Sequence, residues 1–515
     1  MDEYWAKPTR PREQIVMFAP SLDDVIAQDH AVRHMENVLG EVEWTAWEAR
    51  YHGHRGQPPI HPRLVAGAIL YGLMQGIRSS RKLEDATRNR IDFMWFLQGL
   101  TIDHSTFAAF RTTFSEELKS LFRQISFMAV QRSMTTLLEV ALDGTRVRAW
   151  SARDGSRTGK GLEKLLEEAE AKIAKALDEM AACDIADDPA LGTKEEIEKQ
   201  LARIVQERER LEEALEVASE RDEKRRGNGR GGRAVRVPVN DPESYVLPNK
   251  EGGYAPNHTP TVAVDKESGL IVDADVMDGD NEAECVVGAK EEIKETYGVC
   301  PERMSFDGNL ARGETLAELE EEGIAAFTNI DALPVDVVTT DRPDLSKPVR
   351  EEWRDRLPYR GKGKKLHRSA FVYDEQQDCF WCPMGRRLEC YRERIRTARR
   401  IKQRLYRCTD CTQCPLAGRC LSRRAKRRTL IRDEHEECRE RVARRMRTEQ
   451  GKEVYRRRAP LAETPFAYIK GVLGIRQFFV CGLDKVRTEW RWICTAYNLR
   501  KLLGMRQGTY LTSPA

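Results

Sequence analysis

The order of strands and helices after Thr259 is the feature that most constrains the fold of this chain. Two runs of alternating apolar and polar residues flank a Lys-Glu-Ser-Gly turn within residues 259–277. A helical segment, a short strand ending at Asp307, a second helical segment and another strand follow, up to residue 330. This order predicts an α/β domain with a mixed sheet. An earlier alternating segment, residues 139–144, is expected to be the first strand of the same sheet.

Two helical segments with a heptad pattern separate that first strand from the others. Between residues 160 and 225, apolar residues recur at alternating intervals of four and three, on both sides of a break that contains Pro and Gly. This spacing is typical of a coiled coil. We therefore expect residues 160–225 to form an antiparallel coiled-coil hairpin inserted into the sheet domain, with a structural and not a chemical role.

The first 130 residues have a helical pattern. An apolar helix is expected over residues 64–74, followed by a break at Gly76 and a new helix after Ser79 and Ser80, which are suitable N-cap residues. The second helix carries basic side chains, and a helix-turn-helix resting on DNA has this pattern. A small solvated helical bundle has the same pattern. The basic residues proposed to contact DNA are Arg78, Arg81 and Lys82.

The composition excludes a membrane protein. The chain has 515 residues, which is enough for roughly three domains. It contains no run of about 18 apolar residues, so no membrane span is predicted. Its first residues are polar and do not resemble a signal peptide, which predicts a cytoplasmic location.

The cysteines are concentrated in one region. Eight of the 13 lie between Cys379 and Cys438, within a basic segment that we assign to residues 331–454. In a reducing cytosol, such a cluster predicts metal binding and not a disulfide framework. Reduced, metal-free cysteines are the alternative. Zinc would fold an insertion that has little core of its own.

The spacing of these cysteines favours one tetrahedral structural Zn²⁺ site. Two neighbouring motifs, C-x2-C and C-x2-C-x2-C-x5-C, supply the ligands. The proposed ligands are Cys382, Cys411, Cys414 and Cys420. The remaining cysteines, spare thiols or a second site, are Cys379, Cys390, Cys408 and Cys438.

Three acids are placed where they could share metal ions. Asp143 and Asp307 each end a predicted strand, and Glu463 begins the last helical block. Three such carboxylates suit two divalent cations, and hard oxygen ligands select Mg²⁺ or Mn²⁺. Lys470 follows Glu463 by seven residues, so two helical turns place it on the same face, where it could hold a phosphate. Asp143 and Gly144 also match the strongest two-residue hairpin signal, which is the alternative for that position.

Several blocks resemble those of bacterial insertion-sequence DDE transposases. The blocks "ALDGTRVRAW" and "MSFDGN" are similar to two of their signatures, and a third similar pattern is formed by Tyr455, Arg458, Glu463 and Lys470. The block "RSSRKLEDATRNRIDFMWFLQGLTIDHSTFAAFR" resembles their InsH-type N-terminal domain, and "RTEWRWICTAYNLRKLL" resembles their C-terminal end. Together the blocks touch nearly the whole chain in the family's order.

The resemblance implies an architecture and a set of functional residues. It implies a ribonuclease H-like catalytic domain over residues 131–330 and 455–515, preceded by a helical DNA-binding domain over residues 1–130. Asp143 would then lie on the first core strand, and Gly144 would let the backbone pass close to the metal. The implied ligands of two Mg²⁺ (or Mn²⁺) ions are Asp143, Asp307 and Glu463. The implied DNA or phosphate contacts of the catalytic domain are Lys470, Arg458 and Tyr455.

These features predict a DNA transposase of bacterial origin, cytoplasmic and associated with the nucleoid. It would bind the ends of its element, hydrolyse the terminal phosphodiesters and use the 3′-hydroxyls to attack double-stranded target DNA. A homodimer is expected because two ends must be paired. A domesticated metal-dependent nuclease is one alternative. A catalytically silent DNA-binding regulator is another, and retention of the three acids and Lys470 argues against it.

Pro465 departs from a simple helical third block. If a helix starts near Thr464, Pro465 takes its first position and Glu463 precedes the helix. If the helix starts earlier, Pro465 should kink it. The geometry of the third ligand is therefore the one that the sequence determines least.

Overall fold

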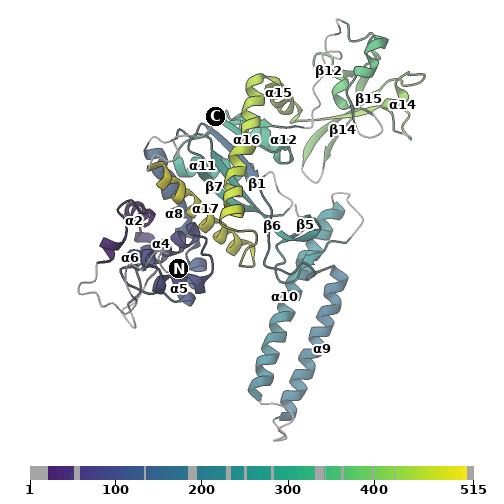
Figure 1. Cartoon of the computed structure of the whole chain (residues 1–515). Helices are drawn as coiled ribbons and strands as arrows, with labels where there is room; N and C mark the ends of the chain where they lie inside the picture. Colours follow the sequence, from purple (N-terminus) through teal and green to yellow (C-terminus); the bar gives the residue numbers. More distant parts are fainter. Residues whose placement is uncertain are drawn as a thin grey trace, which may run out of the picture. The chain divides into compact units, whose positions relative to one another are not determined.

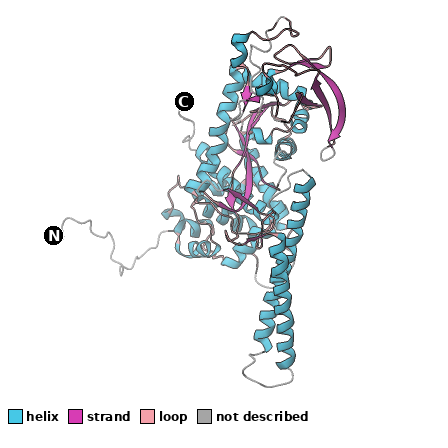
Figure 2. Cartoon of the chain, turned by 90° about the vertical axis from the view of Figure 1, so that its right-hand side faces the viewer, coloured by secondary structure: helices cyan, strands magenta, loops and turns pink. Residues whose placement is uncertain are grey.

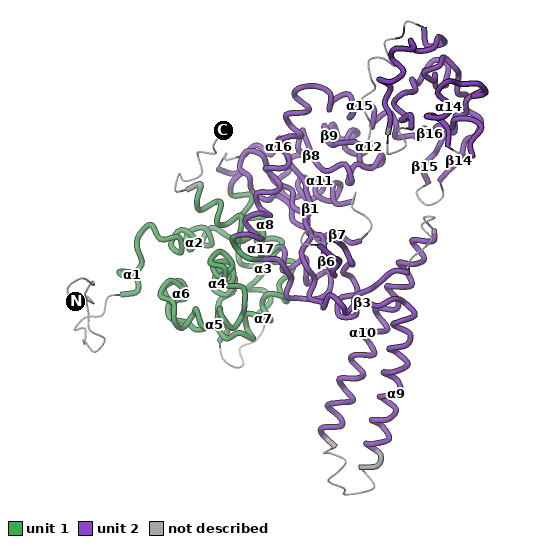
Figure 3. The backbone as a smooth tube through the Cα atoms, turned by 45° about the vertical axis from the view of Figure 1, so that its right-hand side comes forward, with its two compact units in different colours: residues 1–128, 472–474, 491–515 green, residues 129–471, 475–490 purple. Residues whose placement is uncertain are grey.

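Two compact units make up the chain. A computed structural model describes residues 21–51, 58–132, 135–183, 194–227, 234–248, 252–279, 284–330, 342, 344–360, 365–396, 400–422 and 424–506. The N-terminal unit comprises residues 1–128, 472–474 and 491–515, and the sheet unit comprises residues 129–471 and 475–490 (Figure 3). Among the described helices, none combines the length and the apolar character needed to span a membrane.

The N-terminal unit is helical, as its sequence pattern predicts. The apolar helix expected over residues 64–74 is α4, which begins with Pro62 at its first turn and is buried along most of its length. Gly76, with a φ of 73°, follows the end of this helix. The helices of the unit are α1 (Leu22–Val25), α2 (Ala31–Gly40), α3 (Thr45–Glu48), α4 (Pro62–Met74), α5 (Ser80–Asn89), α6 (Ile91–Phe96), α7 (His104–Thr113), most of α8 (Ser115–Gln131) and the larger part of α17 (Leu483–Arg506).

One buried carboxylate in the N-terminal unit is fully engaged in hydrogen bonds. Asp92 receives hydrogen bonds from Nε and Nη2 of Arg90 at 3.1 and 2.5 Å, and from the Tyr71 hydroxyl at 2.8 Å. The backbone N–H of Phe93 donates a further one at 3.0 Å. Because each carboxylate oxygen has partners, this acid links α4 to α6 and helps to hold the unit together.

The sheet unit is built on a mixed sheet, as the sequence predicts. Its central strands lie in the order β7-β6-β1-β8-β9, and β2 and β5 also pair with β6. β6 is antiparallel to β1 and β7, whereas β8 is parallel to β1 and β9. The strands are β1 (Glu139–Gly144), β2 (Val147–Arg148), β5 (Tyr245–Pro248), β6 (Tyr254–Asp265), β7 (Ile271–Met277), β8 (Arg303–Phe306) and β9 (Ala325–Thr328).

The hairpin alternative for Asp143 and Gly144 is wrong. Both residues belong to β1 and pair across the antiparallel ladder with Val262 and Thr261 of β6. Val140, Ala141 and Leu142 of β1 are buried in the core of the unit, which anchors the strand along its length. Burial on both faces therefore outweighs the local turn preference of Asp-Gly.

Helices flank this sheet in Figures 1 and 2. α16 runs along β1, β6, β8 and β9 and buries Ala462, Pro465 and Phe466. Pro460 and Pro465 both lie inside α16, so Glu463 is an interior helix residue and does not begin the helical block. A π-helical turn, η5 (Tyr468–Val472), follows directly. The helices are α11 (Glu284–Tyr297), α12 (Gly313–Glu321), α15 (Glu436–Arg447) and α16 (Glu449–Ala467), with the short η2 (Gly308–Leu310) after β8.

Two long helices occupy the segment in which the heptad pattern was found. α9 (Gly159–Cys183) and α10 (Lys194–Gly227) run side by side in Figure 1 and Figure 2 and bury Leu162, Ala169 and Leu211 between them. A short ladder of β3 (Ser156–Arg157) and β4 (Val237–Pro238) joins the two ends of the pair to the rest of the unit. The connection between the helices lies outside the described residues.

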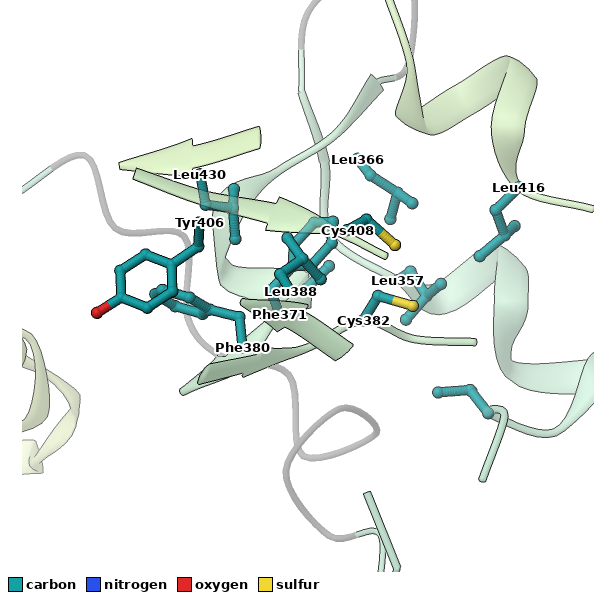
Figure 4. Close-up of a cluster of buried hydrophobic side chains, with 12 residues drawn as sticks. Leu357, Leu366, Phe371, Phe380, Cys382, Leu388, Tyr406, Cys408, Leu416 and Leu430 are labelled. Carbon is teal, nitrogen blue, oxygen red and sulfur yellow. The ribbon is translucent and has the colours of Figure 1, made fainter. Parts of the chain in front are cut away.

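The cysteine-rich segment has a folded core, contrary to the expectation that it has little core of its own. A five-stranded antiparallel sheet packs around buried side chains that include Phe380, Leu388 and Tyr406 (Figure 4). Two of its cysteines, Cys382 and Cys408, belong to this buried cluster. Its elements are η3 (Glu351–Arg356), β10 (Tyr359–Arg360), β11 (Lys365–Leu366), η4 (Arg368–Ala370), β12 (Val372–Asp374), β13 (Cys379–Trp381), β14 (Arg387–Arg396), β15 (Ile401–Cys408), α14 (Ala417–Cys420) and β16 (Thr429–Asp433).

Candidate active site

A cavity of about 590 Å³ opens at one edge of the mixed sheet, within the sheet unit. Two of the three predicted acids, Asp143 and Asp307, line it. Basic and hydrogen-bonding side chains surround these two carboxylates. The cavity could therefore bind an anion by way of a cation that the carboxylates hold. Its other charged or polar lining residues are Thr145, Arg146, Arg148, Asn257, Thr259, Asn309, Lys470 and Arg476.

The sheet itself brings Asp143 and Asp307 together. β1 and β8 are parallel neighbours, and Ala141 lies opposite Ser305. The same register offset places Asp307 opposite Asp143, just beyond the last paired residues. Because parallel strands end at the same edge of a sheet, two strand-terminal acids must meet there.

Each of these carboxylates is oriented by the backbone that follows it. Asp143 Oδ1 accepts a hydrogen bond from Gly144 N at 2.9 Å, and Asp307 Oδ1 accepts one from Gly308 N at 2.8 Å. A side chain at position 308 could not fit, because its Cβ would lie 2.1 Å from the carbonyl oxygen of Asn329. The glycine after the second acid is thus required for the close passage of two backbones.

The environment of Asp143 disfavours its charged form. Burial raises the pKa of Asp143, and the charge of Asp307 contributes to this rise. Arg458 and the N–H of Gly144 oppose it without cancelling it. A desolvated acid beside a second acid is stabilised by a cation. Acids with pKa values shifted in this way are frequent at functional sites.

Arg458 of α16 reaches Asp143. Its Nη1 lies 3.1 Å from Asp143 Oδ2, and both side chains are largely buried, with 14% and 22% of their surface exposed. The guanidinium also lies over the ring of Tyr455, 5.4 Å from its centroid. The structure therefore brings one of the predicted phosphate-contacting residues, Arg458, to the first acid, and a second, Tyr455, lies against its guanidinium.

Lys470 lies in the cavity, whereas Glu463 does not line it. The Lys470 ammonium donates hydrogen bonds to Thr145 Oγ1 at 2.6 Å and to the carbonyl oxygen of Arg146 at 2.7 Å. Glu463 is exposed on α16. The π-helical turn after α16 changes the helical period between the two residues, so the seven-residue spacing does not keep them on one face.

The basic residues predicted in the N-terminal unit lie on or beside α5. Arg81 and Lys82 are exposed in the first turn of that helix. Arg78 precedes it, and its carbonyl oxygen accepts a hydrogen bond from Arg111 at 2.6 Å. Their exposure leaves Arg81 and Lys82 accessible to a macromolecular partner.

Three arginines line the cavity without having been predicted as site residues: Arg146, Arg148 and Arg476. The backbone N–H of Arg148 donates to the carbonyl oxygen of Arg476, and Phe478 N donates to the carbonyl oxygen of Arg148. These bonds attach the segment after η5 to the edge strand β2, and both arginines line the cavity. The "TRVR" sequence after Asp143 was a usable signal for Arg148, whereas Arg476 required the tertiary structure.

The cysteine-rich segment gathers more thiols than the proposed set of four. The neighbouring thiol of Cys408, followed by the N–H groups of Arg386 and Met384, lowers the pKa of the Cys382 thiol. The Cys408 thiol itself donates a hydrogen bond to the carbonyl oxygen of Asp410 at 3.3 Å. Cys382, which directly follows β13, and Cys408, at the end of β15, both belong to the buried cluster drawn in Figure 4. The sequence interpretation leaves Cys408 outside the zinc site, although its C-x2-C spacing with Cys411 is visible in the sequence. The partly buried cysteines packed around the same core are Cys390, Cys411, Cys414 and Cys420.

No three His, Cys, Asp or Glu side chains of the described residues stand together as a metal site. The donors that the structure does bring together are the paired carboxylates of Asp143 and Asp307. Mg²⁺ is commonly held by one or two carboxylates together with the phosphates of its substrate. The cavity fits that donor set, and the phosphate would have to come from the substrate.

Comparisons with known families match both ends of the chain. A family model described as a transposase DDE domain matches residues 381–503, a span that includes the cysteine motif, Arg458, Glu463 and Lys470. A second model, described as a transposase domain (DUF772), matches residues 20–113 and includes the basic residues of α5. No curated protein matches the chain.

Together, the mixed α/β fold and the DDE domain define a nucleic-acid-processing enzyme. The two matches confirm the resemblance to insertion-sequence DDE transposases and support a transposase function.

Proposed function

We propose that this protein is the DNA transposase of an insertion sequence, with a ribonuclease H-like catalytic domain. It binds the terminal inverted repeats, cleaves the phosphodiesters at the ends of the element, and joins the 3′-hydroxyl ends to target DNA by transesterification. The observation that carries the proposal is the meeting of Asp143 and Asp307, at the ends of adjacent parallel strands, in a cavity lined by four basic side chains.

The side chains of the cavity suit contacts with the phosphates of a DNA strand. Arg148 and Arg476 line it, and guanidinium groups bind phosphate oxygens through paired N–H donors. Lys470 is held by Thr145 and the Arg146 carbonyl, so its charge stays in place near the two acids. Such contacts position the backbone of the DNA without reading its sequence.

Asp143 and Asp307 would hold the divalent cation, Mg²⁺ or Mn²⁺. When bound, two such ions activate the attacking oxygen and stabilise the leaving oxygen of an in-line displacement at phosphorus. The raised pKa of Asp143 reflects the cost of burying its charge, and a bound cation would offset that cost. Glu463 is proposed as the third ligand, from the same helix that carries Arg458.

The test measures cleavage and strand transfer on DNA that carries the element's ends. Asp143→Asn and Asp307→Asn should each abolish both reactions in Mg²⁺ and leave DNA binding in the absence of a divalent cation largely intact. Asp275→Asn is the matched control, since Asp275 lies on β7 of the same sheet and pairs with Arg487 at 3.0 Å, outside the cavity. Cleavage without strand transfer would favour a nuclease, and binding without cleavage would favour a regulator.

The N-terminal unit is proposed as the DNA-binding part, working in a homodimer that pairs two ends. Arg81 and Lys82 are exposed on α5 within the span matched by the transposase domain. Neutralising both should weaken binding to all sequences and reduce its dependence on salt, because each phosphate contact releases counterions. The helical pair α9 and α10 is proposed to form a coiled coil that assists assembly.

A structural Zn²⁺ ion is proposed for the cysteine-rich segment. Four thiolates suit tetrahedral Zn²⁺, and the lowered pKa of Cys382 favours the thiolate that zinc requires. Cys408 lies in the same buried cluster as Cys382 and lowers its pKa, which makes Cys408 a candidate ligand. The four ligands that the spacing predicts are Cys382, Cys411, Cys414 and Cys420, and Cys408 is a fifth candidate.

Elemental analysis tests this proposal. We expect about one zinc per chain in the purified protein. Cys408→Ser should lower both the zinc content and the melting temperature, whereas the control Cys438→Ser, on α15, should leave zinc unchanged. Zinc-free protein with normal stability would contradict the proposal.

A further inference from the structure

Arg458 makes an incomplete ion pair with the first acid. Its Nη1 is 3.1 Å from Asp143 Oδ2. Within the described part of the chain, however, neither Nε nor Nη1 of Arg458 has a hydrogen-bond acceptor, although both atoms are buried. The contact is thus an attraction between charges without an aligned N–H bond. Buried donors without acceptors destabilise a structure, so this guanidinium is short of a partner.

The Arg90 side chain of the N-terminal unit forms an ion pair in which both carboxylate oxygens accept hydrogen bonds. Its Nε and Nη2 donate to both oxygens of Asp92, at 3.1 and 2.5 Å. Arg458 has the same guanidinium and a carboxylate at hand, yet it does not adopt this arrangement. Its unused donors remain beside the cavity, where a phosphate oxygen would supply the missing acceptors.

Asp143 Oδ2 cannot serve Arg458 and a divalent cation in the same place. A bound Mg²⁺ lies about 2.1 Å from its carboxylate oxygen. The guanidinium nitrogen already lies 3.1 Å from Oδ2, inside the shell that the ion and its ligands would fill. Two positive groups at such distances repel strongly in a partly buried site. One of them has to leave for the other to bind.

We propose that Arg458 is a built-in counter-ion that occupies the position of the cation at Asp143 in the DNA-free protein. On DNA binding, a backbone phosphate takes the guanidinium and releases Asp143 to the divalent cation. Arg458 is then a positioning residue that makes cation binding depend on DNA. The inference rests on the proposed function, because it takes Asp143 as a cation ligand. The coupling is reciprocal, so the cation also strengthens the grip on DNA.

The test is the affinity for Mn²⁺, measured on the full chain by electron paramagnetic resonance of the free ion, with and without duplex DNA. For the unaltered protein, DNA should tighten Mn²⁺ binding about tenfold or more, within the usual range of coupling between sites. Arg458→Met keeps the length of the side chain and removes its charge. Without DNA it should bind Mn²⁺ about tenfold more tightly than the unaltered protein, and DNA should add little.

Two further variants keep the test decisive. Arg457→Met, next along α16, removes an exposed arginine that pairs with Glu453 at 2.8 Å, and it should behave like the unaltered protein. Arg458→Lys restores a charge and should return the DNA-free affinity toward the unaltered value, which a merely structural role would not do. If Arg458→Met does not fold, Arg458→Gln, which also removes the charge, replaces it as the test variant with the same expected gain in Mn²⁺ affinity.

The failing outcomes separate two errors. If Arg458→Met binds Mn²⁺ no more tightly than the unaltered protein without DNA, Arg458 does not occupy the cation position and the inference is wrong. If Asp143→Asn leaves Mn²⁺ binding unchanged both with and without DNA, Asp143 is not a cation ligand. In that case the proposed function itself fails at this residue.

Discussion

Asp92 in the N-terminal unit and Asp143 in the sheet unit are both buried acids with an arginine beside them. Asp92 receives two hydrogen bonds from Arg90 and one from Tyr71. Asp143 has one backbone N–H and a single misaligned contact from Arg458. The same pair of residue types therefore has its hydrogen bonds satisfied in one region (a closed pair) and unsatisfied in the other (an open pair).

The pKa values move in opposite directions for this reason. Burial acts to raise the pKa of Asp92, but hydrogen bonds from Arg90 and Tyr71 outweigh it, so the pKa is lowered. Burial also raises the pKa of Asp143, and there Arg458 does not outweigh it. An acid with every oxygen satisfied stabilises the fold, whereas one left short of partners is available to a ligand.

The largest expected effect is on catalysis at the open acid. Asp143→Asn removes the charge with little change in volume, so cleavage should fall by at least about 10³-fold, the scale of a lost electrostatic contribution to a transition state. The free energy of unfolding should stay the same or rise, because a desolvated charge is removed. Single-turnover cleavage and chemical denaturation check the two halves. A marked loss of stability would break the comparison with Asp92.

Glu463→Gln tests whether the exposed third acid joins the site on substrate binding. If it does, cleavage should fall by at least about 100-fold, while Mn²⁺ binding in the absence of DNA should be unaffected. Glu453→Gln, which carries the same change two helical residues before Tyr455, is the control. Cleavage at the unaltered rate would show that Asp143 and Asp307 act without Glu463.

Asp92→Asn should mainly affect stability. The variant loses charge-assisted hydrogen bonds in the N-terminal unit, which should cost about 2 kcal/mol of the free energy of unfolding. Calorimetry of the full chain measures this. Tyr71→Phe removes one of the same hydrogen bonds and should cost about 1 kcal/mol. Unchanged stability in both variants would mean that Asp92 is not the structural acid we take it to be.

The smallest effect is a difference in how stability depends on pH. Because the folded pKa of Asp92 is lowered, its contribution is present above the unfolded value of about 3.9 and is lost as pH falls below it. Because that of Asp143 is raised, its charge destabilises the fold at higher pH, and stability is regained as pH falls through the raised value. Asp92→Asn should flatten the loss in acid, and Asp143→Asn should remove the regain. Unfolding free energies between about pH 7 and pH 3 test both signs.

Much of the site could be predicted from local pattern. The strands that end at Asp143 and Asp307 were visible as alternating apolar runs, and the α/β order placed both in one mixed sheet. The apolar helix α4 was likewise predicted. These predictions hold because a period of two or of 3.6 residues reports directly which side chains face a core.

Other features contradict local preference. Pro460 and Pro465 should end or kink a helix, yet α16 contains both and buries Pro465 and Ala462 against the unit. The π-helical turn that follows was not predicted. This turn, and not a continuous α-helix from Glu463, places Lys470 in the cavity. The core of the cysteine-rich segment was missed, although β15 alternates buried and exposed residues over most of its length.

The sequence by itself determined which residues carry the chemistry: two strand-terminal acids, a basic third block and a set of spaced thiols. Only the tertiary structure decided which residues lie next to them in space. It placed β8 beside β1, so that the two acids meet, and it set Arg458 against Asp143 while leaving Glu463 exposed. The physical reason is one of scale. Local preferences are worth about 1 kcal/mol or less per residue, apart from proline, and burial of whole helix and sheet faces overrides them.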